Sequence, residues 1–123
     1  MNRALRILAV DNEPSVTLSL RYVFPEPRYE TVCADSGNAA LTRLDSDPTP
    51  YDVIILDEKM PQLTGTELVG EIRKRGIKGK IIVVSAYLTP ETREAYERMN
   101  VQVMFSKPFN IDVLRTAVDR LVV

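Results

Sequence analysis

The chain of 123 residues contains no histidine, no tryptophan and a single cysteine. Without histidine, it has no imidazole to act as a general base, a metal ligand or a phosphate carrier. Cys33 cannot form a disulfide within the chain, and we expect it to be a small buried strand residue in a reducing compartment. No apolar run reaches transmembrane length, and Asp11 interrupts the first one too early for a signal peptide. We therefore expect a cytoplasmic protein.

Neither sign of charge predominates. The chain has 16 Lys and Arg against 17 Asp and Glu, so its net charge is −1. This balance gives no electrostatic case for nucleic acid binding. The densest basic run, residues 73–75 with Lys78 and Lys80, surrounds a predicted helix end, where it complements the helix dipole. We expect no direct contact with nucleic acid or with a membrane.

Length and composition indicate one domain. A chain of 123 residues with 45% hydrophobic residues can bury a core without disulfides. We find no internal repeat, linker or low-complexity segment. We expect residues 1–123 to form this single domain, with no output domain within them.

Polar residues follow four apolar runs, at the point where each run ends. Unbroken runs of Val, Ile and Leu indicate strands that are buried on both faces of a parallel sheet. The strands predicted from these runs and the residues after them are 6–10 with Asp11, 51–56 (whose unbroken run is 53–56) with Asp57, 81–84 with Ser85, and 101–105 with Ser106 and Lys107. Ligands bind at the carboxyl ends of such strands. Two carboxylates, a hydroxyl and a lysine suit Mg²⁺ together with a phosphoryl group.

Helical patterns alternate with these runs and with a further strand at residues 30–34. The predicted helices cover residues 14–24, 37–44, 66–75, 90–99 and 111–122, and Ser36 and Thr89 are the predicted N-caps of the second and fourth. The fourth has only a narrow apolar stripe of Ala95, Tyr96 and Met99, which predicts weak anchoring. The last has a continuous inward face of Ile111, Leu114, Ala117, Val118 and Leu121. The pattern predicts an α/β, flavodoxin-like fold, doubly wound around a five-stranded parallel sheet of order 2-1-3-4-5 with five helices on both faces.

Four short motifs carry a family resemblance. They are Asp11-Asn12-Glu13-Pro14, Leu56-Asp57 with Met60-Pro61 and Gly65, Ser85-Ala86, and Lys107-Pro108-Phe109. Each is weak alone, but their order and spacing over essentially the whole chain are specific. The chain resembles the receiver domain of the two-component response-regulator family.

The resemblance implies a role for each of these positions. Asp57 would be the phosphoacceptor, which takes a phosphoryl group from a phosphohistidine of a sensor histidine kinase or phosphotransfer protein. Lys107 would pair with a phosphoryl oxygen or with Asp57, and Ser85 would donate a hydrogen bond to the phosphoryl group. The bond between Lys107 and Pro108 would be cis. Mg²⁺ would be held by Asp11, Asn12, Asp57 and the backbone carbonyl of Lys59. Such a chain is a signalling receiver, which catalyses only its own phosphorylation and dephosphorylation.

Several positions tune this chemistry or depart from the family pattern. Asn12 stands where the family usually has a second metal-binding aspartate, so Mg²⁺ affinity should fall. Lys59 and Tyr87 could shield the acyl phosphate from water, which predicts slow self-dephosphorylation, while the small Ala86 leaves the phosphoryl group room. Met104 replaces the usual switching Tyr or Phe. Phe105 should face the other side of the strand.

The resemblance also places the partner surfaces. The predicted output face, toward a downstream target or output domain, comprises the helix at 90–99, the strand at 101–105 and the helix at 111–122. A kinase would approach near the first helix and the Asp57 loops, and phosphorylation-dependent homodimerisation is left open.

Glu13 fits a metal ligand or an exposed residue near the helix N-terminus equally well. Gly65 needs only a turn role.

Parts of the sequence also fit other functional classes. Residues 54–58 resemble a Walker B strand, but Glu71 follows Gly65 and Gly70 where a Walker A loop requires lysine, and no Gly-x-Gly-x-x-Gly occurs. These absences argue against an NTPase and a dinucleotide site. The stronger alternative is a degenerate receiver, a phosphorylation-independent protein docking module with a metal site weakened by Asn12.

Overall fold

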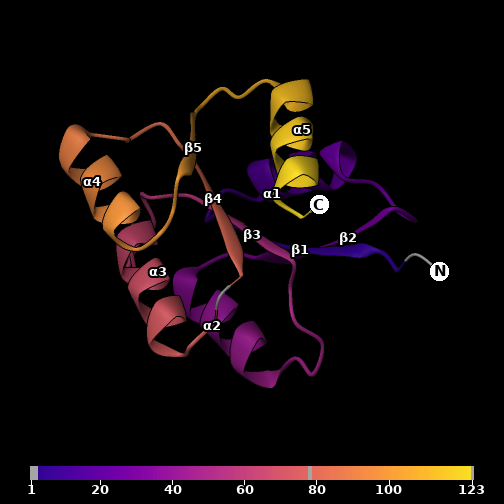
Figure 1. Cartoon of the computed structure of the whole chain (residues 1–123), viewed down its shortest axis with the longest axis horizontal. Coiled ribbons are helices and arrows are strands. Elements are labelled where there is room, and N and C mark those ends of the chain that lie inside the picture. Colours follow the sequence, from indigo (N-terminus) through magenta and orange to yellow (C-terminus); the bar gives the residue numbers. More distant parts are fainter. Residues whose placement is uncertain (1–2, 78, 123) are drawn as a thin grey trace.

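The computed structural model describes residues 3–77 and 79–122, in which strands and helices alternate along the chain (Figure 1). The elements are β1 (Leu5–Val10), α1 (Pro14–Val23), β2 (Tyr29–Ala34), α2 (Gly37–Ser46), β3 (Val53–Leu56), α3 (Gly65–Lys74), β4 (Lys80–Ser85), α4 (Pro90–Arg98), β5 (Val103–Ser106) and α5 (Ile111–Leu121). All predicted elements are present. β3 and β5 each begin two residues later than predicted, and Lys78 of the basic run lies outside the described residues.

The five strands form one parallel sheet in the order β2-β1-β3-β4-β5, as predicted. β1 pairs with both β2 and β3, and this register sets Val10 beside Leu56. At the other side of the sheet, Ser85 lies opposite Ser106. The residues that follow β1, β3, β4 and β5 therefore leave the sheet at the same edge.

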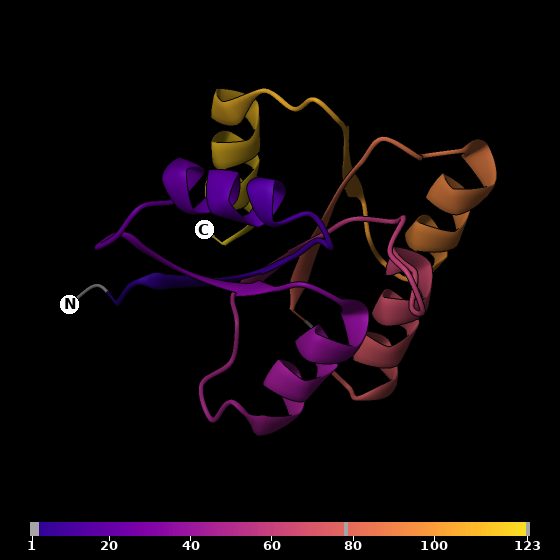
Figure 2. The same ribbon diagram turned by 180° about the vertical axis from the view of Figure 1, so that it is seen from behind.

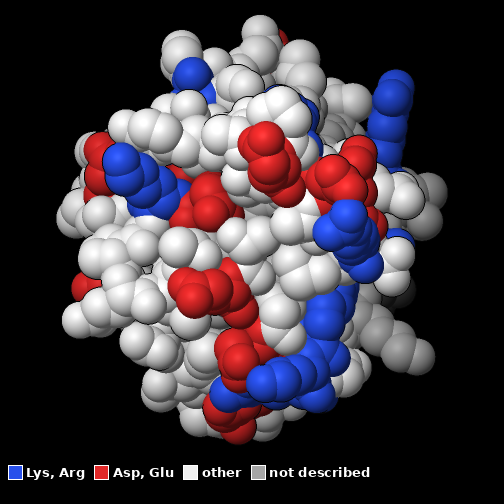
Figure 3. Space-filling model, turned by 90° about the vertical axis from the view of Figure 1, so that its left-hand side faces the viewer, with Lys and Arg blue, Asp and Glu red and all other residues white. Residues whose placement is uncertain are grey.

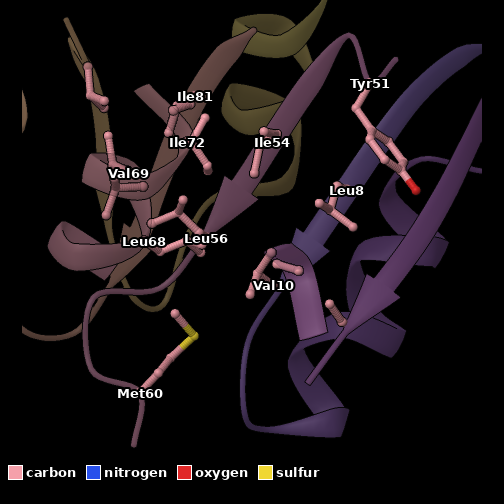
Figure 4. Packing of buried hydrophobic residues seen from close by; sticks show 14 of the residues in the cluster. Leu8, Val10, Tyr51, Ile54, Leu56, Met60, Leu68, Val69, Ile72 and Ile81 are labelled. Atoms are coloured by element: carbon pink, nitrogen blue, oxygen red, sulfur yellow. The ribbon is translucent and has the colours of Figure 1, made fainter. Parts of the chain in front are cut away.

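Helices cover both faces of the sheet. α1 and α5 lie on one face, and α2, α3 and α4 lie on the other (Figures 1 and 2). Alternate residues of β1 enter two separate cores: Leu8 and Val10 pack beneath α2, α3 and α4 (Figure 4), whereas Ile7 and Ala9 pack beneath α1 and α5. A strand enclosed in this way has no polar face, which explains the unbroken apolar runs in the sequence.

Side-chain caps begin most of the helices. Ser36 and Thr89 accept hydrogen bonds from backbone N–H groups in the first turns of α2 and α4, which confirms both predicted caps. Thr64 begins α3 in a reciprocal capping box with Glu67, and Asn110 caps α5. These contacts satisfy N–H groups that have no partner within the helix.

Some packing predictions were wrong. Ile111 is 51% exposed because it occupies the first position of α5, beside its cap, so Leu114 and Val118 are the buried residues of that helix. Cys33 is only half-buried. Met104 and Phe105 do pack on opposite faces of the sheet, as predicted. None of the described helices is long and apolar enough to cross a membrane.

Candidate functional site

The carboxyl edge of the sheet brings Asp11, Asp57 and Lys107 into contact. Asp11 follows β1 and Asp57 follows β3, and both side chains are buried. The ammonium of Lys107, after β5, donates to Asp11 Oδ2 at 2.8 Å and to Asp57 Oδ2 at 3.2 Å. The bond between Lys107 and Pro108 is cis, as predicted. Three residues far apart in the sequence thus form one charged cluster.

Backbone hydrogen bonds beyond the strand ends hold these residues in place. The N–H of Asp57 donates to the carbonyl of Val10 at 3.2 Å, and the N–H of Lys107 donates to the carbonyl of Ser85 at 3.0 Å. The parallel ladders therefore continue to Asp57 and Lys107 themselves, and these backbone hydrogen bonds fix their relative positions.

Negative charge exceeds positive charge in this cluster. Asp57 Oδ1 is the one buried side-chain oxygen or nitrogen in residues 3–77 and 79–122 that has no hydrogen-bond partner. A buried carboxylate oxygen without a partner carries a desolvation cost, so it commonly marks a binding or reactive position. One lysine faces two buried carboxylates, and its second contact is the longer one.

The titration behaviour of the cluster reflects this imbalance. Burial raises the pKa of Asp11, although the hydrogen bond and charge of Lys107 oppose the rise. Burial disfavours charged Lys107, but the hydrogen bond to Asp11 and the charges of Asp11 and Asp57 outweigh it and raise the pKa of the lysine. Lys107 is therefore a cation throughout the neutral range. Its single positive charge does not balance the acidic side chains of the site, so a further cation would be bound favourably there.

Glu13 joins the acidic cluster. One carboxylate oxygen from each of Asp11, Glu13 and Asp57 lies within 4.8 Å of the other two. The N–H of Glu13 donates to Asp11 Oδ1 at 2.9 Å, which turns the chain back toward the sheet edge before α1 begins. Sequence reasoning left the role of Glu13 open. The Asp-x-Glu spacing directly after a strand was the available signal, because a tight turn there returns the second acid to the first.

The residues present fit a hard divalent cation. Carboxylate, amide and carbonyl oxygens are the ligands that Mg²⁺ prefers, and this site offers three carboxylates, one of which contains the unpartnered Oδ1 of Asp57. Asn12 and Lys59, the other predicted ligands, line the same cavity but are exposed. The acidic cluster could therefore hold a metal, with Glu13 added to the predicted set.

A cavity of about 550 Å³ opens over Asp57. Its lining consists of Asn12, Glu13, Asp57, Lys59, Met60, Pro61, Ala86, Tyr87 and Lys107. The cavity has room for a phosphoryl group together with hydrated ions. Ala86 and Tyr87, at the start of the loop after β4, form its wall on the side away from β1.

Ser85 lies behind this wall. Its side chain is fully buried and does not line the cavity, and its hydroxyl oxygen accepts the N–H of Tyr87 at 3.2 Å. Because that contact uses only the oxygen, the hydroxyl hydrogen remains free to be donated. The structure therefore places Ser85 next to the site, with its donor capacity unused.

Two of the predicted tuning residues contact each other. The ammonium of Lys59 lies 4.3 Å from the centroid of the Tyr87 ring, in a cation–π arrangement at the surface. The pair joins the loop after β3 to the loop after β4 across the cavity. Met104 is remote from this contact and packs, half-buried, into the core beneath α2, α3 and α4.

Glu58 has a role that sequence reasoning missed. Its carboxylate accepts the N–H of Thr66 at 2.9 Å, the hydroxyl of Thr66 at 2.8 Å and the hydroxyl of Tyr96 at 2.5 Å. In the Walker B interpretation this glutamate would orient a water molecule at the metal. Here it is not among the residues that line the cavity, and it connects α3 with α4 instead.

The chain belongs to the response regulator receiver domain family. A model of that family matches residues 7–119, which is nearly the whole chain. Among solved structures, the receiver domain of the Francisella response regulator 1452 is 29% identical with a TM-score of 0.85 and 95% of each chain covered. The Vibrio cholerae chemotaxis protein CheY4 is 27% identical with a TM-score of 0.86, covering 98% of this chain and 99% of that one.

Relatives among curated proteins differ in length. The chain is 35% identical to the regulatory protein AtoC of Escherichia coli over 94% of its own length, but it spans only 24% of AtoC. It is 28% identical to sporulation initiation phosphotransferase F of Bacillus subtilis, covering 94% of this chain and 91% of that protein. The same domain thus occurs both as part of long regulators and as nearly the whole of a short protein.

Proposed function

We propose that Asp57 accepts a phosphoryl group from a phosphohistidine of a sensor histidine kinase or phosphotransfer protein, in a reaction that depends on Mg²⁺. The observation that carries this proposal is the unpartnered Oδ1 of Asp57, which lies beside a Lys107 ammonium bound to Oδ2. The cavity above it supplies the space for a donor phosphoryl group. The similarity to a short protein named as a phosphotransferase supports the same reaction.

The covalent step follows from this arrangement. Asp57 Oδ1 attacks the phosphorus atom, the P–N bond of the donor breaks, and the imidazole leaves with the electron pair of that bond. The product on this chain is an acyl phosphate. Phosphoryl transfer depends mainly on positioning and on neutralising charge. Lys107, already between two carboxylates, can pair with a phosphoryl oxygen, and Ser85 has a free hydroxyl hydrogen for another.

Asp11, Glu13, Asp57, Asn12 and the backbone carbonyl of Lys59 are the groups that would hold Mg²⁺. When bound, the metal supplies positive charge that offsets the phosphoryl oxygens. Two of its carboxylate ligands, Asp11 and Asp57, are fixed by the sheet, whereas Glu13 and Asn12 are exposed. Because Asn12 brings no charge, we expect weaker Mg²⁺ binding than a second aspartate would give.

A partner has a surface next to this site. A groove of about 690 Å³ separates α1 from the start of α5, and Lys107 belongs to both the groove and the site cavity. Its rim exposes apolar side chains, with Tyr22 86% and Ile111 51% exposed. Such a surface suits the apolar face of a partner helix that carries the phosphohistidine. The surface formed by α4, β5 and α5 would then signal to a downstream protein.

Intact mass spectrometry after incubation with a small phosphodonor tests the proposal. The wild-type chain should gain one phosphoryl group, only with Mg²⁺ present, and Asp57→Asn should gain none. Asp52→Asn, at the opposite edge of the sheet, is the matched control and should behave like the wild type. A folded chain that gains no phosphoryl group at high Mg²⁺ would instead be a docking module that does not use phosphorylation.

A further inference from the structure

Tyr96 joins α4 to the loop that follows Asp57. Its ring is fully buried, although most residues of α4 are polar. Figure 3 shows acidic and basic side chains interspersed on this side of the molecule. The hydroxyl of Tyr96 donates to Oε1 of Glu58, the residue next to Asp57, at 2.5 Å. The helix predicted to be weakly anchored therefore has a buried polar anchor in the functional site's own loop.

Glu58 is held firmly at the other side of this hydrogen bond. Its carboxylate also accepts the backbone N–H and the hydroxyl of Thr66, in the first turn of α3. Its backbone carbonyl accepts the N–H of Gly65 at 2.8 Å. A carboxylate is favoured at a helix N-terminus, so α3 fixes the acceptor that Tyr96 uses.

Gly65 makes the close approach of these segments feasible. A Cβ at this position would lie 2.3 Å from the Tyr96 hydroxyl oxygen and 2.4 Å from the carbonyl oxygen of Asp57. The φ angle of Gly65 is not positive, so the turn role predicted from the sequence is not the reason for glycine here. Glycine is needed because the loop after β3, the start of α3 and Tyr96 meet at this point.

A second anchor holds the C-terminal end of α4. The guanidinium of Arg73, on α3, donates to the carbonyl of Met99 at 3.0 Å and also to the carbonyls of Ile77 and Gly79. Both anchors therefore lie in the C-terminal part of α4, where Met99 contacts α3 and Tyr96 contacts the Asp57 loop. A shift of the Asp57 loop would act on α4 at this end of the helix.

We propose that the hydrogen bond between Tyr96 and Glu58 makes α4 follow the phosphorylation state of Asp57. This inference rests on the proposed function. A phosphoryl group on Asp57 occupies the cavity between the loops after β3 and β4, and the tether carries the resulting shift of the first loop into α4. Met104 offers no hydroxyl for such a connection. Coupling of this kind is reciprocal, so removing it changes both sites.

Amide hydrogen exchange of the wild type and of Tyr96→Phe, each with and without the phosphoryl group, tests the tether. The variant keeps the buried ring and loses only the hydroxyl. Tyr51→Phe is the matched control, because the hydroxyl of Tyr51 also bonds a carboxylate, that of Asp47, but at the other edge of the sheet. Exchange in β1 and β3 reports whether each variant is folded.

In the unphosphorylated protein, Tyr96→Phe should raise exchange in residues 90–98 and 58–66 together, by about tenfold. Phosphorylation should change exchange in α4 of the wild type and of Tyr51→Phe. In Tyr96→Phe that change should be lost, although intact mass still shows the added phosphoryl group.

An α4 response that persists in phosphorylated Tyr96→Phe would overturn the inference. So would an unphosphorylated variant whose exchange matches the wild type in both segments. A wild-type chain that gains no phosphoryl group would overturn the proposed function, and the coupling with it. The unphosphorylated arm separates that failure from a failure of the tether itself.

Discussion

The two edges of the sheet both gather charged side chains, but they balance them differently. At the amino edge, Asp52 binds the guanidinium of Arg3 and the backbone N–H of Arg6, while Glu30 binds the side chain of Arg6. At the carboxyl edge, one lysine serves Asp11 and Asp57, and an oxygen of Asp57 has no partner. The contrast separates charges that are balanced within the fold from charges that, under the proposed function, a bound cation would balance.

The same contrast appears in two aspartates. The hydrogen bond from Arg3 lowers the pKa of Asp52, with the backbone N–H of Arg6 as a further cause. Burial raises the pKa of Asp11 despite its contact with Lys107. The folded state thus favours the charged form of Asp52 and disfavours the charged form of Asp11. This penalty is consistent with the metal-binding role proposed for Asp11.

The largest expected effect comes from removing the cation at the carboxyl edge. Lys107→Met should lower the free energy of unfolding by about 3 kcal/mol, because it leaves two buried carboxylates without a counter-charge. Arg3→Ala, whose side chain is 69% exposed, should change stability little. Urea denaturation of both variants measures the difference. Equal losses would mean that the two edges do not differ as described.

A second comparison concerns two glycines of α3. Gly65→Ala should destabilise by about 1–3 kcal/mol, because its Cβ would overlap the carbonyl of Asp57 and the hydroxyl of Tyr96. Gly70→Ala should stabilise by about 0.5–1 kcal/mol, because the nearest atom to its Cβ lies 4.0 Å away and alanine favours a helix. Thermal unfolding gives both values. Stabilisation by both substitutions would remove the argument for close packing next to the site.

The two aspartates should give opposite dependences on pH. Because the folded-state pKa of Asp11 is raised above 3.8, its contribution is present at low pH and is lost as pH rises through that folded-state value. Because the folded-state pKa of Asp52 is lowered, its contribution is present above 3.8 and is lost as pH falls through the folded-state value.

Denaturation between about pH 3 and pH 7 without Mg²⁺ checks these signs. The wild type should lose stability relative to Asp11→Asn as pH rises, and should lose stability relative to Asp52→Asn as pH falls. If the stability difference from the wild type changed with pH in the same direction for both variants, the unfavourable charge could not be assigned to the carboxyl edge alone.

The smallest expected effect concerns the lifetime of the acyl phosphate. Lys59→Ala removes the cation that lies over Tyr87 beside the cavity, so water should reach the phosphoryl group more easily and its loss should be a few-fold faster. Lys80→Ala, at the amino end of β4, is the control and should not change the rate. Phosphorylated protein followed by intact mass gives both rates. An unchanged rate for Lys59→Ala would remove the shielding role.

The sequence was sufficient for the order of the sheet and the convergence of the strand ends. Unbroken apolar runs define buried parallel strands, and the first one or two polar residues after each run must then lie at the carboxyl edge. Asp11, Asp57 and Lys107 were predictable for this reason. The caps Ser36 and Thr89 were also predictable, because the hydroxyl side chain directly precedes a helical pattern.

Contacts between side chains from different segments were not predictable in this way. The pairing of Glu58 with Tyr96 depends on how α4 packs on α3, which no local pattern encodes. The burial of Ser85 and the exposure of Ile111 depend on the loops and helix ends around them. For Glu13, the deciding fact was the hydrogen bond that turns its backbone toward Asp11.

Titration with Mg²⁺ of the wild type, Asp11→Asn and Asp52→Asn, by isothermal calorimetry, tests the contrast between the two edges most directly. We predict that the wild type and Asp52→Asn bind one Mg²⁺ with equal affinity and that Asp11→Asn binds it far more weakly. Equal affinity in all three proteins would contradict the assignment of the unbalanced carboxylates at the carboxyl edge to a metal and phosphoryl site.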